Sequence, residues 1–121
     1  MSKELAPSQL LDPGSRRAWR AWLKAHHASA QEIWLVFWKK HTGKATILYN
    51  DAVEEALCFG WIDSTVRRLD DDRYAQRFTP RNPRTPYSPA NKERLRYLVG
   101  KGLVIPEVLA TLDFLDDGKT L

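Results

Sequence analysis

The apolar positions of the chain first recur with the period of a helix. Trp19, Trp22 and Leu23 stand at helical spacing, and basic residues occupy much of the remaining surface of the same segment. Ser15 precedes this pattern at the position where a serine hydroxyl accepts a hydrogen bond from the first helical turn. We therefore expect a half-buried helix over residues 15–27.

The pattern then changes to a strand and returns to a helix. Residues 33–38 read Ile-Trp-Leu-Val-Phe-Trp, a short apolar run rich in β-branched and aromatic side chains, which predicts a central strand. Residues 52–60 read as a short helix, because Asp51 precedes them, Glu54 follows at capping-box spacing and Gly60 stands at a C-cap position.

Residues 61–69 and 73–79 flank three aspartates and predict a β-hairpin. Directly opposed residues share a face of the sheet, so an odd loop at residues 70–72 separates apolar from polar side chains. The face expected on the core holds Ile62, Ser64, Val66, Tyr74, Gln76 and Phe78. The outer face then holds Asp63, Thr65, Arg67, Arg77 and Thr79.

The C-terminal third is punctuated by prolines. Four of them space out an extended stretch over residues 81–87, which cannot form a full strand ladder. Ser88 and Pro89 predict the start of a helix, and Pro106 that of a final helix through Leu115. The fold class is therefore α+β, with a small antiparallel sheet of about three strands, including the hairpin, packed with about four helices.

Length and composition indicate the size of the domain and the cellular compartment in which we expect it. A chain of 121 residues that is 43% hydrophobic and 28% charged fits a single packed domain, over residues 15–121, after an N-terminal arm over residues 1–14. We find neither a membrane-spanning apolar run nor a signal-peptide pattern, so we expect a cytoplasmic protein without membrane insertion. The net charge of +4 suits anionic partners but selects none of them.

Familiar catalytic and metal-binding patterns do not fit. The run Thr42-Gly43-Lys44 lacks the first glycine and the final hydroxyl residue of a phosphate-binding loop. The histidines and Cys58 show no metal-ligand spacing, so we expect no metal and no cofactor. We interpret His26 and His27 as a helix-dipole partner and a packing residue.

The candidate site is the polar face of the hairpin and its continuation. Its residues are Trp61, Asp63, Arg67, Arg77, Thr79 and Arg81. Arginine presents a planar fork of donors that grips a carboxylate or a phosphate through two bonds. In this hypothesis Thr79 adds a neutral hydrogen bond and Trp61 an apolar wall, while Asp63 either orients a guanidinium or accepts from a donor of the ligand. The face then captures an anionic small molecule or a protein partner.

Three alternatives stay open. The same residues can form a surface lattice of ion pairs, Asp63 with Arg77 and the aspartate turn with Arg73. An enzyme can use Asp63 as a general acid or base beside the arginines. A nucleic-acid-binding domain, which we favour less, can use the basic residues of the first helix and the stretch near Arg81 and Arg84.

Several runs also resemble one known family. These are EEALCFGWID at residues 54–63, YAQRFTPR at 74–81 and YSPAN at 87–91, and the segments around Trp19-Arg20-Ala21-Trp22 and residues 34–44 are similar too. Together they resemble the YdeI/OmpD-associated, or bacteriocin-protection, family over roughly residues 15–115. Tyr87 stands where the family usually has tryptophan. The resemblance implies a short form that lacks the usual C-terminal helical segment.

The resemblance implies a biological setting more than a chemistry. It implies a bacterial protein with a role in stress resistance or in protection against bacteriocins and antimicrobial peptides. It implies no particular reaction. The sequence therefore leads to a ligand-binding protein as the first hypothesis and leaves the ligand and the oligomeric state open.

Overall fold

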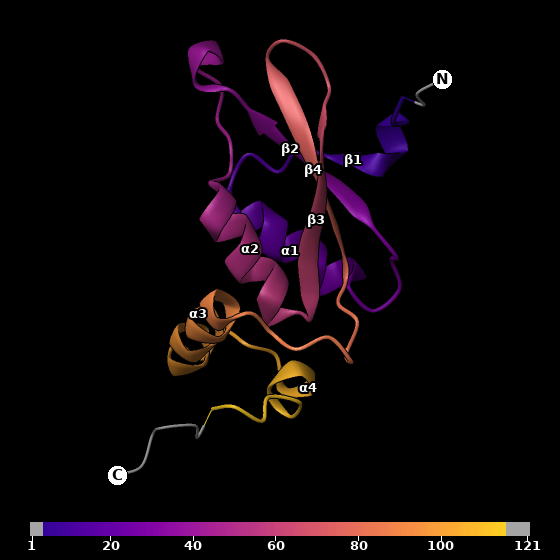
Figure 1. Cartoon of the computed structure of the whole chain (residues 1–121). Coiled ribbons are helices and arrows are strands. Elements are labelled where there is room, and N and C mark those ends of the chain that lie inside the picture. The colour runs from indigo at the N-terminus through magenta and orange to yellow at the C-terminus, as the bar shows by residue number, and fades with distance from the viewer. Residues whose placement is uncertain (1–3, 116–121) are drawn as a thin grey trace.

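The computed structural model describes residues 4–115 and has an α+β fold, as the sequence predicts (Figure 1). The strands are β1 (Leu10–Leu11), β2 (Ile33–Trp38), β3 (Trp61–Arg68) and β4 (Arg73–Pro80). The helices are α1 (Arg16–His26), α2 (Tyr49–Cys58), α3 (Pro89–Gly100) and α4 (Pro106–Leu109), with short 3₁₀ turns at Pro7–Gln9 and Lys40–Thr42. Every helix in this part of the chain is too short or too polar to cross a bilayer.

The strands form one mixed sheet in the order β1-β2-β4-β3. The sheet has one strand more than expected, because β1 pairs in parallel with β2 through Leu10 and Leu11 within the predicted N-terminal arm. A two-residue strand is too short for a periodic signal, which explains why the pattern missed it. In Figure 1, α1 and α2 lie beside the sheet, whereas α3 and α4 lie at the end of the molecule opposite to the tip of the hairpin.

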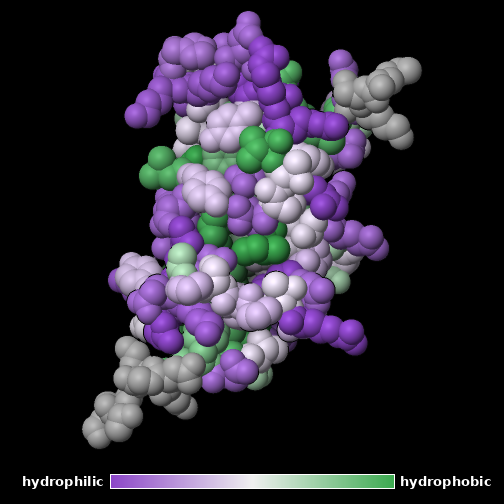
Figure 2. Space-filling model, in the orientation of Figure 1, coloured by the Kyte–Doolittle hydropathy of each residue, from purple (hydrophilic) through white to green (hydrophobic). Residues whose placement is uncertain are grey.

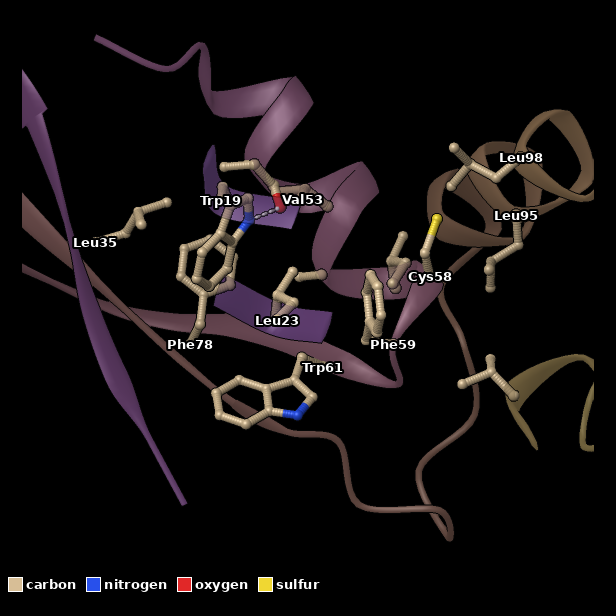
Figure 3. Close-up of a cluster of buried hydrophobic side chains, with 14 of the residues drawn as sticks. Trp19, Leu23, Leu35, Val53, Cys58, Phe59, Trp61, Phe78, Leu95 and Leu98 are labelled. Atoms are coloured by element: carbon tan, nitrogen blue, oxygen red, sulfur yellow. Dashed lines mark hydrogen bonds between the residues drawn. The ribbon is translucent and has the colours of Figure 1, made fainter. Parts of the chain in front are cut away.

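The core lies between the sheet and α1 and α2 and continues to Leu95 and Leu98 of α3 (Figure 3). Trp19 is fully buried, packs edge-on against Phe78 with 5.2 Å between ring centroids, and donates a 2.9 Å hydrogen bond to the carbonyl oxygen of Ala52. Cys58 is buried in the same cluster, as expected from its sequence context, and burial raises the pKa of its thiol to about 11. This core fixes the ends of the strands from which the candidate site is built.

The boundaries of α1 and α2 show how local signals and tertiary contacts compete. The Ser15 hydroxyl accepts a 3.1 Å hydrogen bond from the Ala18 amide, which confirms the predicted cap of α1. The prediction that Asp51 caps α2 is wrong, because this helix already begins at Tyr49. The Asp51 carboxylate lies 3.0 Å from Arg16 instead.

Arg16 and Arg20 bind the acidic side of α2 and clamp the two helices together. Arg16 contacts Glu54 at 2.7 Å and Glu55 at 2.5 Å, and Arg20 contacts Glu55 at 2.8 Å. Glu55 is only 3% exposed, so its carboxylate depends on these two guanidinium groups. The clamp uses two of the basic residues that a nucleic-acid interface on the first helix requires.

The predicted register of the hairpin is right near the tip and wrong beyond it. Val66 pairs with Gln76 as expected, but a β-bulge between Asp63 and Val66 shifts the ladder by one residue. Asp63 therefore pairs with Phe78, and Ile62 pairs with Thr79. Because one extra residue inverts the alternation of side chains, Asp63 lies on the helix-covered face and Ile62 on the outer face.

The C-terminal third follows its proline signals with one correction. The stretch after β4 is a loop, as expected, and the Ser88 hydroxyl caps α3 by accepting a 3.1 Å hydrogen bond from the Asn91 amide. Helix α4 ends at Leu109, so the predicted continuation to Leu115 is wrong.

Candidate functional site

The structure separates the two central residues of the predicted binding face from the rest. Trp61 is 1% exposed and donates a 3.2 Å hydrogen bond to the carbonyl oxygen of His27, so its indole belongs to the core and forms no ligand wall. Asp63 accepts hydrogen bonds of 2.8 Å from the Tyr49 hydroxyl and 2.9 Å from the Gln76 amide. The bulge thus removes Asp63 from the arginine side of the sheet.

The arginines nearer to the hairpin tip partly confirm the ion-pair alternative. Arg73 binds Asp70 at 2.9 Å, and this guanidinium lowers the pKa of the Asp70 carboxyl. Arg68 binds Asp71. The proposed pair of Asp63 with Arg77 is wrong, because Arg77 contacts Glu32 at 2.6 Å. Figure 2 shows that the tip end of the molecule is strongly hydrophilic.

Arg67 lies apart from the remaining candidates. Its guanidinium lies 5.7 Å from the centroid of the Trp34 ring. It lines a cleft of about 470 Å³ together with Arg68, Arg73 and the N-terminal segment that contains Glu4 and Leu5. This cleft lies near the hairpin tip, so Arg67 does not share a site with Thr79 or Arg81.

Arg81, in contrast, is held in place at the end of β4 by contacts of both its side chain and its backbone. Its guanidinium carbon lies 3.5 Å from the centroid of the Tyr87 ring, and Nη2 donates a hydrogen bond to the carbonyl oxygen of Thr85. The backbone amide of Arg81 donates a 2.8 Å hydrogen bond to the carbonyl oxygen of Gly60. These contacts hold both the backbone and the head group, which reduces the entropy that the side chain loses when it binds a ligand.

Three adjoining clefts meet at Arg81 and Tyr87, the two residues that line all of them. We call the first the Arg81 cleft; its volume is about 320 Å³, and it includes Arg84, Lys92 and Asp113. The Thr79 cleft, of about 410 Å³, lies along Ile62 and the start of α3 and is lined by Thr79, Asn82, Thr85, Ser88 and Asn91. The His27 cleft, of about 210 Å³, lies toward α4 and is lined by His27, Phe59, Glu107 and Thr111.

The loop that forms these clefts is shaped by its own local contacts. The Asn82 side-chain oxygen accepts a 2.9 Å hydrogen bond from the Arg84 amide, and the Thr85 amide donates to the Asn82 carbonyl oxygen at 3.0 Å. This tight turn reverses the chain before Tyr87 packs edge-on against Phe114, with 5.7 Å between ring centroids. The aromatic contact attaches the loop to the segment after α4.

The Arg81 cleft carries an excess of positive charge. It is lined by three cationic side chains, those of Arg81, Arg84 and Lys92, and by one acidic side chain, that of Asp113. Between residues 4 and 115, no salt bridge includes any of the three cations. The N–H groups of these three cations that have no carboxylate partner among residues 4–115 can donate to a carboxylate or a phosphate of a ligand.

The Thr79 cleft adds neutral polar groups to this positive site. Its hydroxyl and amide side chains come from the end of β4, the loop and the first turn of α3, and Ile62 and the prolines supply an apolar wall. Thr79 and Arg81 are therefore the two predicted site residues that the structure brings together. Thr79 lines the Thr79 cleft and Arg81 lines all three clefts, although the face around them differs from the predicted one.

Other residues of the clefts escaped the sequence analysis. Lys92 lies four residues after the helix cap Ser88, so its place on the first turn of α3 could have been recognised. His27, Glu107 and Asp113 come from segments distant in sequence, and no local pattern links them to Arg81. Among the described residues, no group of three or more histidine, cysteine or acidic side chains has the arrangement of a metal site.

The model of a family described as "Domain of unknown function (DUF8412)" matches residues 11–111. The chain belongs to this family. No curated protein and no solved structure matches the chain. The match covers β2, β3 and β4 and all the residues that line the three clefts at Arg81 except Asp113 and Phe114. The resemblance to the YdeI/OmpD-associated family stays a prediction beside this assignment.

Proposed function

We propose that this DUF8412 domain is a small ligand-binding protein that captures an anionic group in the Arg81 cleft. The observation that carries the proposal is the Arg81 guanidinium, stacked 3.5 Å from the Tyr87 ring centroid and without a carboxylate partner among the described residues. A charge-assisted hydrogen bond contributes about 1.5–3 kcal/mol, so two such bonds from a prearranged fork support recognition of one carboxylate or phosphate.

The neighbouring groups support an anion over a neutral ligand. Arg84 and Lys92 line the same cleft, and the side chains of the adjoining Thr79 cleft include several hydroxyl and amide donors. From its resemblance to the YdeI/OmpD-associated family, we propose a bacterial protein with a role in stress resistance or antimicrobial-peptide protection. The proposal includes the cytoplasmic location that we expect from the sequence. A small molecule suits the clefts better than a protein partner, since each holds only a few hundred Å³.

Catalysis through Asp63 receives less support from the geometry. The Asp63 carboxylate accepts hydrogen bonds from Tyr49 and Gln76, and none of the described clefts is lined by it. Arg67 and Arg77, which the enzyme hypothesis needs for electrostatic stabilisation, lie on the opposite face of the sheet from Asp63.

Nucleic-acid binding is also less well supported. Arg16 and Arg20 on α1 are bound by the carboxylates of α2, so this helix offers a nucleic acid only part of its basic charge. Binding to phosphate backbones falls steeply as salt concentration rises. Retention on a DNA or RNA oligonucleotide at low salt, lost at high salt and insensitive to Arg81, would favour this alternative.

The test measures binding of inorganic phosphate and of a panel of small carboxylates by calorimetry and by thermal stabilisation. We expect Arg81→Ala to abolish the binding, and Arg81→Lys to retain only part of it, because lysine keeps the charge but loses the planar fork. Arg17→Ala is the matched control, since Arg17 is exposed on α1 and lines none of the clefts. If no anion binds, or if binding survives in Arg81→Ala, the proposal is wrong.

A further inference from the structure

The His27 cleft lacks the excess of cationic side chains of the Arg81 cleft and is lined by several hydrogen-bond acceptors. His27 Nδ1 lies 2.9 Å from the carbonyl oxygen of Leu23. A carbonyl oxygen only accepts hydrogen bonds, so Nδ1 carries the proton of the neutral ring and Nε2 presents its lone pair. His27 Nε2 has no hydrogen-bond partner among residues 4–115. It is also not buried, because the one buried side-chain polar atom without a partner in this part of the chain is Arg96 Nε. Nε2 is therefore open to solvent.

Two further acceptors line the same cleft. The Thr111 hydroxyl donates a 2.7 Å hydrogen bond to the carbonyl oxygen of Val108, which leaves its oxygen lone pairs for a ligand donor. The Glu107 side chain is exposed, and none of the salt bridges in the described part of the chain includes it. A carboxylate accepts hydrogen bonds only, so Glu107 adds a negative charge to two neutral acceptors.

The walls of the His27 cleft also suit a cation. The lining includes two aromatic residues, Phe59 and Tyr87, and two aliphatic residues, Ile105 and Val108. Both aromatic rings already attract a guanidinium, since Arg20 lies 4.9 Å from the centroid of the Phe59 ring and Arg81 lies 3.5 Å from that of Tyr87. Aromatic rings attract ammonium groups, and the attraction grows when the cation is partly removed from water. The one cationic side chain of this cleft is Arg81, which stands at its border with the Arg81 cleft.

We infer that the ligand is a small zwitterion, with an ammonium group in the His27 cleft and a carboxylate or phosphate group in the Arg81 cleft. The two clefts share Arg81, Pro83, Tyr87 and Thr111, so one compact molecule can reach both. Glu107, His27 Nε2 and the Thr111 hydroxyl accept from the ammonium group, while Arg81, Arg84 and Lys92 donate to the anionic group. This inference rests on the proposed function, because it takes the Arg81 cleft as the anion site.

Simple fragments test the two halves separately, without knowledge of the natural ligand. The probes are ethylammonium, acetate and inorganic phosphate, each titrated into the ¹⁵N-labelled full chain and followed through amide chemical shifts. We expect ethylammonium to shift the amide signals of Phe59, Val108 and Thr111, and the anions to shift those of residues 81–87 other than the two prolines, Pro83 and Pro86. The dissociation constants from these titrations identify the anionic group. Tighter binding of acetate than of phosphate indicates a carboxylate, and the reverse indicates a phosphate.

Two variants connect these shifts to the charges. Glu107→Gln keeps the shape of the side chain and should weaken ethylammonium binding about tenfold or more, because a charged partner becomes neutral, while anion binding is retained. Glu4→Gln removes the same charge beside a different cleft and should leave both unchanged. A bound anion should strengthen ethylammonium binding several-fold, and Arg81→Ala should remove this coupling.

The outcomes separate this inference from the proposed function. If the anions bind through Arg81 but ethylammonium causes no shift near Glu107, or binds Glu107→Gln equally well, the zwitterion inference is overturned and the anion-binding function stands. If neither acetate nor phosphate binds, the proposed function fails, and the zwitterion inference fails with it, whatever ethylammonium does.

Discussion

The strongest prediction for stability concerns Glu55, the buried carboxylate between α1 and α2. Glu55 is 3% exposed and is contacted by Arg16 at 2.5 Å and by Arg20 at 2.8 Å. Glu55→Gln preserves the size of the side chain but removes the charge that both guanidinium groups face. The two cations then lie next to each other at a partly buried position without their common partner.

The expected cost follows from the burial of the pair. Breaking a buried ion pair destabilises a protein by about 3–5 kcal/mol, but a glutamine oxygen still accepts one hydrogen bond and the arginine side chains are partly exposed, so we expect about 2–4 kcal/mol. The side chains of Arg16 and Arg20 are 33% and 31% exposed, which supports the lower part of the range. For a domain of 121 residues the melting temperature falls by about 3–5 °C per kcal/mol.

Urea denaturation followed by circular dichroism measures this loss, with thermal melting as the second assay. Glu54→Gln is the matched control, because Arg16 keeps Asp51 and Glu55 when Glu54 loses its charge, and we expect a loss of about 1 kcal/mol or less. Equal losses in the two variants, or a change below about 0.5 kcal/mol in Glu55→Gln, would refute the assignment of Glu55 as the centre of the clamp.

Three further predictions test other parts of the fold. Burial raises the pKa of the Cys58 thiol from 9.0 to about 11 in the folded protein. The buried neutral thiol therefore contributes fully to the free energy of unfolding below pH 9, and this contribution is lost as the pH rises toward 11. Urea denaturation across this pH range should show a smaller fall in the free energy of unfolding for Cys58→Ala. Asp63→Ala should lower the free energy of unfolding by about 1–2 kcal/mol through the loss of two hydrogen bonds, while calorimetry shows unchanged anion binding; weakened binding would return Asp63 to the site. Gly60 has a φ of +77°, and a Cβ there would lie 3.3 Å from Val108, so thermal melting of Gly60→Ala should show a loss of about 1–2 kcal/mol, and an unchanged melting temperature would contradict that backbone conformation.

The sequence predicted the elements where the local signal is strong. The helix after Ser15 and the apolar strand at residues 33–38 appear where expected, because a hydroxyl cap and a continuous apolar run act within a few residues. The hairpin is also predicted, and its register holds next to the loop, where loop length sets the pairing.

The candidate site depended on interactions that no local pattern contains. The bulge between Asp63 and Val66 places Asp63 on the helix-covered face of the sheet. Arg77 forms its salt bridge with Glu32 rather than with Asp63, the expected partner. Parity arguments count residues evenly along a strand, so one inserted residue reverses every assignment beyond it. Arg81 was chosen for its charge, but its cleft arises from its stack on Tyr87 and from the packing of Tyr87 on Phe114.

The sequence by itself thus determined the α+β class, the caps of α1 and α3 and the supply of arginines near the end of the hairpin, since these follow from periodicity, capping chemistry and composition. Only the tertiary structure decided which arginines are paired with carboxylates and which remain available to a ligand. It also brought His27, Glu107 and Lys92 around Arg81 from three helical segments. The physical reason is that ion pairing and cleft shape depend on distances between residues far apart in the chain, which the order of amino acids does not display.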